Sequence, residues 1–504
     1  MGDLKRDAWP QLPLPLEELR RAENRYFGGE TRLYDLTRIG WVRRLLKRRW
    51  LQFVVTLPNL AIFFLALAGG FIGADGANRG PDQFGSAITW YLWFAAVAAS
   101  MLFLGRLWCL ICPFGGLGEW IQRRTPWKKK PKALGLDLNW PRRLANFGVL
   151  PSVAGFFLLT LWEEYQGVAG PGDPRYTSYL VIMIFASAIL VYLIFDRRTY
   201  CHYLCPLTAL IGVFTTPSVL SGFRARNRDV CLECEGKDCI RGNANGYGCP
   251  WLVYPGSNAT NQGCGLCTEC FKTCPNDNVG LYLQPPLTNV HSPGRRRMDL
   301  AIALAVLWGM VWYEQWNAFP WFSNPQGTGL DDVLNRITGW PHYPNLLDFV
   351  GLTFVVPLFF YLYVRVTTRL FPAVGDWRKA FMAQAYALIP LVGSDYLARQ
   401  LPKFWDHIVR VPLSLTDPFG WNWRSFQRIP LWNFHILSNA GVVESQVVLT
   451  ILGTGASLYA AWRIRDRDYP RERGAGAFLA SACLVILLAG VYTAWMYIQM
   501  AGAE

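Results

Sequence analysis

Histidine and several signature motifs are scarce in this chain, and each absence argues against a class of protein. Only 5 of the 504 residues are histidines, and no C-x-x-C-H motif occurs, so covalent c-type haem is not expected. None of these histidines lies centrally in a long apolar stretch, so a membrane haem held by two histidines is also disfavoured. The five are His202, His291, His342, His407 and His435. The chain does not open with a charged segment, a short apolar stretch and an A-x-A site, so we expect no removable signal peptide.

Charged residues are also few, and long apolar stretches take their place. Charged residues make up 17% of the chain and hydrophobic residues 52%. This composition is too apolar for an ordinary soluble enzyme. Several stretches reach the roughly 20 apolar residues needed to cross about 30 Å of hydrocarbon. We therefore predict a mainly α, polytopic transmembrane helical protein with about nine spans, near residues 50–72, 87–105, 145–162, 178–195, 299–317, 347–367, 380–400, 446–462 and 476–500.

The formal net charge of +14 lies mostly beside these apolar stretches. That distribution follows the positive-inside rule, and anionic membrane lipid is a sufficient partner for it. No basic face typical of a nucleic-acid-binding domain is found, so no nucleic-acid partner is expected. With the N-terminus inside, the Arg- or Lys-rich loops after Leu104, Phe195, Arg365 and Trp462 also lie inside. We therefore expect every cysteine motif at the cytoplasmic face of an inner membrane.

Twelve of the 13 cysteines fall in motifs, and the most specific of these is a ferredoxin run. Cys264, Cys267, Cys270 and Cys274, with Pro275 directly after, have the C-x₂-C-x₂-C-x₃-C-P spacing of a [4Fe–4S] ferredoxin. A tight loop of this kind delivers three thiolates to one cubane, while the fourth cysteine typically ligates a neighbouring cluster. The run therefore predicts iron–sulfur ligation and a second cluster nearby.

A stretched run just upstream supplies the second set of thiols. Cys231 and Cys234 form a C-x₂-C pair, and Cys239 and then Cys249-Pro250 follow at longer intervals. Taken alone this half would also suit a zinc knuckle. Beside the ferredoxin run, crossed ligation assigns one cluster to Cys231, Cys234, Cys239 and Cys274, and the other to Cys249, Cys264, Cys267 and Cys270.

Two further cysteine pairs, each followed by proline, stand at the ends of apolar stretches as an internal repeat. They are Cys109 and Cys112 before Pro113, and Cys201 and Cys205 before Pro206. Because proline turns the chain, both thiols of a pair can face one spot. The pairs could jointly ligate a third cluster, bind Cu(I) or exchange thiols, or be structural packing, and all three uses stay open. We expect the lone Cys483, in an apolar stretch, to be a small core residue.

This arrangement resembles the NapH/NosR-type membrane polyferredoxins, which include electron-transfer and maturation proteins for periplasmic nitrate and nitrous oxide reductases. The resemblance covers roughly residues 50 to 300. Members usually have C-x-x-x-C-P at both positions, whereas the first pair here is one residue shorter. NosR-type relatives also carry a covalent flavin at a Ser/Thr-Gly-Ala-Thr-like motif. Thr454-Gly-Ala-Ser457 matches it only faintly, inside an apolar stretch where small residues favour helix packing, so no flavin is expected.

These observations predict a basic cytoplasmic arm (1–49), a four-helix membrane domain (50–223), a two-cluster ferredoxin-like insert (224–292) and C-terminal transmembrane helices (293–504). The expected function is electron transfer between a quinone pool or a cytoplasmic donor and a partner redox enzyme, as a subunit of an oxidoreductase complex rather than a stand-alone enzyme. The tryptophan-rich loop 401–442 is typical of an interfacial belt, and alternatively of a docking face for a quinone or an extracytoplasmic partner. The alternative function is a maturation factor that uses its clusters to reduce copper or thiols.

Overall fold

The computed structural model of the chain has helices in the regions predicted to span the membrane. His342, His435, the lysines 128–130 and Arg295 lie outside the residues that it describes. The described residues are 33–73, 83–125, 134–166, 173–292, 296–316, 333, 336–337, 344–372, 375–421, 436–469 and 474–501.

Six helical segments among the described residues are long and apolar enough to cross a membrane, which confirms a mainly α, polytopic membrane protein. Two are α3 (Leu51–Ile72) and α10 (Pro174–Ile194). A third, Phe84–Leu104, comprises α4 (Phe84–Ala87), the π-helical η4 (Ile88–Trp93) and α5 (Phe94–Leu104). The others lie in α18 (Pro344–Leu370), α21 (Asn439–Asp468) and α22 (Gly474–Ala501).

The remaining three predicted spans are also helices, but of a different character. The apolar parts of α9 (Leu150–Gln166) and α16 (Met298–Trp316) are shorter than a full span. The long α19 (Trp377–His407) is more polar, and its buried stretch includes Gln384, Ser394 and Asp395. Each expected region is therefore helical, although the count of nine membrane spans is not confirmed.

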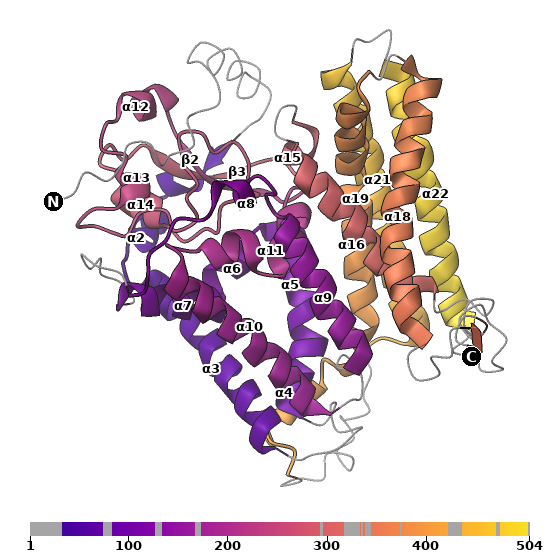
Figure 1. Ribbon diagram of the computed structural model, residues 1–504, viewed down its shortest axis with the longest axis horizontal. Helices are drawn as coiled ribbons and strands as arrows, with labels where there is room; N and C mark the ends of the chain where they lie inside the picture. Colours follow the sequence, from indigo (N-terminus) through magenta and orange to yellow (C-terminus); the bar gives the residue numbers. More distant parts are fainter. Residues whose placement is uncertain are drawn as a thin grey trace.

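The helix α19 is the central helix of the C-terminal bundle. It packs against α16, α18, α21 and α22, and it also contacts α5 and η4 of the first half of the chain. Figure 1 shows α16, α18, α19, α21 and α22 side by side, with α3, α7 (Pro113–Arg123) and α10 on the opposite flank. Because α19 offers small residues such as Ala383, Ala387 and Gly393, neighbouring helices approach it closely. Its Leu391 N–H donates to the Ser457 hydroxyl in α21, at 3.0 Å.

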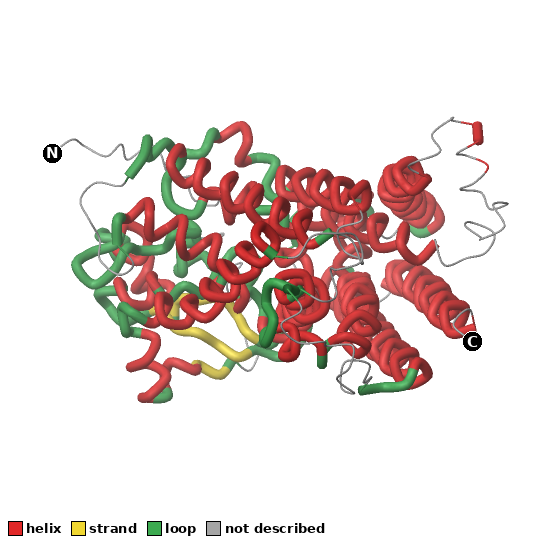
Figure 2. Tube along the Cα trace, turned by 90° about the horizontal axis from the view of Figure 1, so that it is seen from below, coloured by secondary structure: helices red, strands yellow, loops and turns green. Residues whose placement is uncertain are grey.

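The predicted insert, the residues just before it and a short part of the N-terminal arm form a small sheet with short helices beside it. Strand β3 (Val279–Leu283) lies in the middle, antiparallel to β2 (Leu220–Ala225) on one side and to β1 (Tyr34–Asp35) on the other. In Figure 2 these strands are the small yellow group among helices and loops. Strand β1 comes from the predicted N-terminal arm, so this part of the arm is built into the sheet of the insert.

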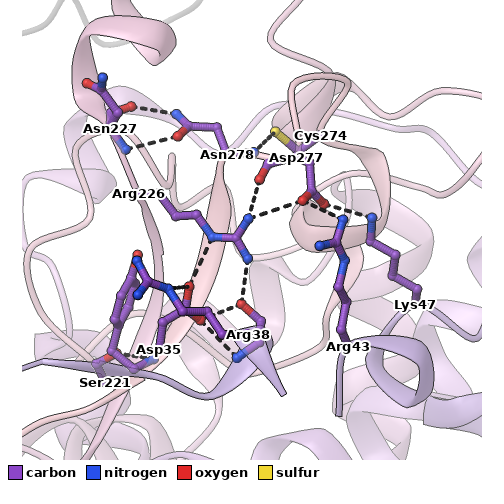
Figure 3. Close-up of polar contacts among 12 residues, drawn as sticks. Asp35, Arg38, Arg43, Lys47, Ser221, Arg226, Asn227, Cys274, Asp277 and Asn278 are labelled. Atoms are coloured by element: carbon purple, nitrogen blue, oxygen red, sulfur yellow. Dashed lines mark hydrogen bonds and ion pairs between the residues drawn. The ribbon is translucent and has the colours of Figure 1, made fainter. Parts of the chain in front are cut away.

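Ion pairs hold the arm to the insert next to a predicted cluster ligand. After β1 the chain forms α2 (Gly40–Leu46). Arg43 and Lys47 bond the carboxylate of Asp277 at 2.6 and 2.8 Å, and Arg226 reaches both Asp277 and Asp35 at 3.1 and 3.0 Å (Figure 3). The carboxylate of Asp277, three residues after Cys274, therefore fastens the arm beside that cysteine.

One expectation about the cysteines is wrong. Cys483 is exposed on α22 rather than buried as a small core residue. An apolar helix in a membrane protein has an apolar outer face as well as an apolar inner face, so hydrophobicity alone does not show which face a residue occupies.

Candidate iron–sulfur and cysteine–proline sites

The first predicted thiol set gathers around a single asparagine. Cys231 lies on α12 (Arg228–Glu233) and Cys239 on α13 (Asp238–Arg241). The backbone N–H of Asn278 donates to Cys274 Sγ and its side-chain amide donates to Cys231 Sγ, both at 3.3 Å (Figure 3 shows the first). Burial raises the pKa of Cys239 to about 12, and the nearby Cys274, Cys231 and Cys234 add to the shift. The structure thus brings together the four cysteines that crossed ligation assigns to one cluster.

The second set gathers in the same way around Cys249. Burial and the neighbouring Cys264 raise the pKa of Cys249 to about 11. Burial and the neighbouring Cys249 raise the pKa of Cys267 to about 12. Burial raises the pKa of Cys270, on α14 (Glu269–Thr273), and the neighbouring Cys249, Cys264 and Cys267 add to the shift. Cys249 therefore lies beside the ferredoxin run although it precedes that run along the chain.

The loop that carries the ferredoxin run has an unusual backbone. Leu266 and Thr268 adopt left-handed conformations, with φ of 55° and 66°. Such turns point successive backbone N–H groups inward and are typical of anion-binding loops and iron–sulfur sites. Gly265, the residue just before Leu266, has no room for a side chain, because a Cβ would lie 2.0 Å from Nε1 of Trp251. Trp251 therefore packs directly on the loop that presents Cys264 and Cys267.

The two cysteine–proline pairs also converge. Cys109 lies in α6 (Leu107–Ile111), and Cys112 is the residue before α7 (Pro113–Arg123). Cys201 lies in the π-helical η5 (Tyr200–Leu204), and Cys205 precedes Pro206 and α11 (Leu207–Phe214). Burial and the neighbouring Cys201 raise the pKa of Cys112 to about 12. Burial also raises the pKa of Cys205, and Cys201, Cys112 and Cys109 add to that shift. The two halves of the internal repeat thus present their four thiols to one another.

The chemistry of these thiols suits a group that takes them as thiolates. Every cysteine is free of disulfide bonds. Burial and mutual repulsion disfavour clustered thiolates, unless iron or another soft cation shares their charge. Within the described ranges no three His, Cys, Asp or Glu side chains lie close enough together to hold one metal ion. The first set is related by the shared hydrogen-bond donor Asn278, and the other two by the electrostatic interactions among their own cysteines.

Buried charged residues that the motifs did not reveal lie beside the cysteine–proline set. Arg106 and Arg198 are 3% and 1% exposed, and Arg198 donates from Nε to Glu119 at 2.5 Å. The sequence does carry a signal for the two arginines, because each stands three residues before the first cysteine of its pair (Cys109, Cys201). The repeat thus includes an R-x-x-C element.

A large, mostly apolar cavity opens from the cysteine–proline set into the bundle. Its volume is about 500 Å³, and its lining includes all four thiols at one end. Arg399, Gln400 and Lys403 of α19 and Glu163 of α9 also line it. The segment after α19, α20 (Arg410–Ser414), packs against α4, at the opposite end of the Phe84–Leu104 span from Cys109. The cavity therefore extends from the thiols toward the other side of the membrane domain.

A family model described as "4Fe-4S binding domain" matches the chain twice, at residues 86–132 and 177–223. Each match contains one apolar span and the cysteine–proline pair that follows it. Both end before the predicted ferredoxin insert (224–292) begins. The comparison therefore supports [4Fe–4S] chemistry in the membrane domain as well.

Three relatives are similar over parts of their length. Regulatory protein NosR of Stutzerimonas stutzeri is 25% identical over 222 residues, which cover 42% of this chain and 28% of that protein. Protein NirI of Paracoccus denitrificans is 27% identical over 194 residues (36% and 26%). The putative electron transport protein YccM of Escherichia coli is 31% identical over 109 residues (21% and 28%). The chain spans less than a third of the length of each, and no solved structure matches.

The family-model matches support the binding of [4Fe–4S] clusters by this chain. The two family-model matches contain the cysteine–proline pairs, whose thiols the structure brings close to one another. The chain is a multi-pass membrane protein with two 4Fe-4S binding domain matches, and its resemblance to the NapH/NosR-type membrane polyferredoxins is thereby confirmed.

Proposed function

We propose that this protein carries electrons between a quinone held in the membrane domain and a partner redox enzyme, through iron–sulfur clusters at the cytoplasmic face of an inner membrane. Two clusters are held by the insert, one by Cys231, Cys234, Cys239 and Cys274 and the other by Cys249, Cys264, Cys267 and Cys270. A third is held by Cys109, Cys112, Cys201 and Cys205. When bound, these clusters supply one-electron chemistry.

The observation that carries the proposal is the continuity of the three thiol sets and the cavity. Cys239 of the first set interacts electrostatically with Cys249 of the second. Trp251 touches the loop of the second set and also lines the cavity into which the third set opens. The three thiol sets therefore follow one another from the insert to the apolar cavity, with Trp251 between the second and the third.

The shape and lining of the cavity support a quinone as its occupant. A long apolar space suits an isoprenoid tail, and a few polar groups at the wall suit a quinone ring. Oxidation of a quinol releases two electrons and two protons. The clusters would take the electrons one at a time, and Glu163 and Gln400 line the same cavity as polar groups that can exchange or orient the protons.

Iron and sulfide quantitation, with EPR, on the anaerobically purified full chain tests the proposal. Three [4Fe–4S] clusters correspond to about twelve irons per chain and two clusters to about eight. Zinc in place of iron would contradict it. Addition of a short-chain quinol is then expected to reduce the clusters, and a chain whose clusters respond to dithionite but not to quinol would refute the quinone link.

The alternative is a maturation function, and one observation favours it. Four converging thiols beside a cavity form a soft ligand set that also suits Cu(I). Stoichiometric Cu(I) binding to the iron-loaded protein, abolished by Cys109→Ser together with Cys205→Ser, would support this alternative over a third cluster.

A further inference from the structure

We propose that Arg106, Arg198 and Trp251 form a buried donor layer between the second insert set and the cysteine–proline set, and that this layer raises the reduction potential of the clusters on both of its sides. The inference rests on the proposed third cluster for one side of the layer. The other side faces Cys264 and Cys267, which belong to the insert.

Arg106 and Trp251 make the first contact between the two sets. The guanidinium of Arg106 lies 5.3 Å from the centroid of the Trp251 ring, and its Nη2 donates to the Thr208 carbonyl at 3.3 Å. Trp251 is 2% exposed and packs against Gly265 of the ferredoxin run. Arg106 interacts electrostatically with Cys109 on one side and with Cys264 on the other. Its charge is therefore shared by both sets.

Arg198 makes an equivalent contact from the other half of the repeat. Its Nη1 donates to the Cys109 carbonyl at 3.2 Å. A Cβ on Gly115 would lie 3.2 Å from this Nη1 and 3.4 Å from Cys201 Sγ, so the guanidinium and the thiol lie next to each other. Arg198 also interacts electrostatically with Cys267 of the insert.

The layer holds N–H groups that lack an acceptor. Within the described part of the chain, Nε and Nη1 of Arg106, Nη2 of Arg198 and Nε1 of Trp251 are buried and make no hydrogen bond. Buried donors normally have partners, and each exception needs an explanation. The sulfur atoms of an anionic cluster on either side supply such acceptors. Four orphan donors between two thiol sets therefore point to a sulfur ligand.

The effect on potential follows from charge. Reduction adds an electron to a cluster that is already anionic, so a nearby positive charge or N–H donor stabilises the reduced form. Low local polarity strengthens this effect, and all three side chains are buried. Because the repeat contributes one arginine from each half, both halves are needed for the full effect.

An EPR-monitored redox titration of the detergent-purified full chain tests the donor layer. For Arg106→Gln we expect unchanged iron content and a lower potential at two clusters. The expected change is about tenfold in the ratio of oxidised to reduced cluster, which is 59 mV for a one-electron couple. Trp251→Phe removes one donor without removing a charge, so the expected decrease is smaller. Arg44→Gln, which removes an exposed arginine of α2, is the matched control and should leave all potentials unchanged.

The outcomes separate the donor layer from the third cluster. Unchanged potentials in Arg106→Gln with full iron would overturn the donor layer. About eight irons in the unmodified chain would overturn the third cluster alone. The donor layer would then still predict that Arg106→Gln lowers the reduction potential of the insert cluster. If Arg106→Gln loses iron, Arg106→Lys keeps the charge and is expected to restore iron and near-normal potentials, and its failure to do so would overturn the layer.

Discussion

At the scale of single residues, the thiols act as sets rather than as individuals. Cys112 and Cys239 each have a pKa raised to about 12 by burial and by their neighbours. A set of this kind is stable as thiolates only when a metal shares the charge, so removal of one member disturbs its whole set.

Replacement of Cys109 and Cys205 by serine is expected to remove one complete cluster. The double variant should lose about four irons per chain and one EPR signal, because a cubane needs four thiolates and the pair supplies two of them. Cys483→Ser, at an exposed position of α22, is the control and should keep the full iron content. Full iron in the double variant would assign the cysteine–proline pairs to another role.

Motif spacing predicted the members of these sets but not the residues around them. Asn278, which bonds the sulfur atoms of Cys231 and Cys274, belongs to no motif. Arg106 and Arg198 recur at the same distance before each pair, yet their burial against the thiols depends on how the two halves of the repeat meet. Ligand spacing is a local property, whereas the surroundings of a ligand come from distant segments.

At the scale of elements, the short α2 is held to the insert chiefly by Asp277. Partial burial pushes the pKa of Asp277 up, but the hydrogen bond and charge of Lys47, together with Arg226 and Arg43, hold this pKa below its usual range. A lowered folded-state pKa stabilises the contact above the pKa of the unfolded chain. That stabilisation is lost as pH falls through the folded-state pKa.

Asp277→Asn is therefore expected to weaken the attachment of α2 to the insert at neutral pH, as low pH is expected to do in the unmodified protein. Exposed ion pairs contribute ~1 kcal/mol or less each, so the change should appear as faster proteolysis within residues 33–49 rather than as global unfolding. Asp229→Asn, on α12, is the control. Equal protease sensitivity in Asp277→Asn and the unmodified protein would contradict this role of the ion pairs.

Close packing of α16 on α18 depends on one glycine. A Cβ on Gly309 would lie 2.7 Å from the Thr353 carbonyl oxygen and 2.9 Å from that of Leu352, and backbone cannot move aside as a side chain can. We expect Gly309→Val to destabilise the bundle by about 1–3 kcal/mol, seen as a lower Tm in detergent.

The matched control for this prediction is Gly351 of α18, where an added Cβ meets nothing within 4 Å. Gly351→Ala should leave Tm unchanged or raise it slightly, because alanine favours helix more than glycine does. A Tm for Gly309→Val equal to that of Gly351→Ala would show that α16 and α18 do not pack at this distance.

At the scale of the whole molecule, the first half of the chain and the C-terminal bundle together enclose the cavity. Its walls come from α3, α5, α9 and α10 on one side and from α16 and α19 on the other. The C-terminal helices, which the sequence left without a role, thus complete a space that the four thiols open into.

Filling this space is expected to block quinol-dependent reduction. Ala96 of α5 lines the cavity, so Ala96→Phe should slow cluster reduction by quinol at least tenfold, which corresponds to about 1.4 kcal/mol. Reduction by dithionite, which needs no membrane site, should be unchanged. Ala61→Phe on α3, outside the cavity lining, makes the same chemical change at an exposed position. Equal quinol rates in both variants would remove the cavity from the electron path.

The sequence by itself determined the local features of this protein. Apolar runs established the helices, and cysteine spacing established the iron–sulfur motifs and the repeat, because both depend on residues within a few turns of one another. It did not show which face of α22 exposes Cys483, or that β1 of the N-terminal arm pairs with β3.

Only the tertiary structure decided how these local features meet. It joined Cys109 and Cys112 to Cys201 and Cys205, placed Arg106, Arg198 and Trp251 between thiol sets, and closed the cavity with α19. The physical reason is that packing of helices far apart in the chain depends on the shapes of whole faces, which no short pattern of residues specifies.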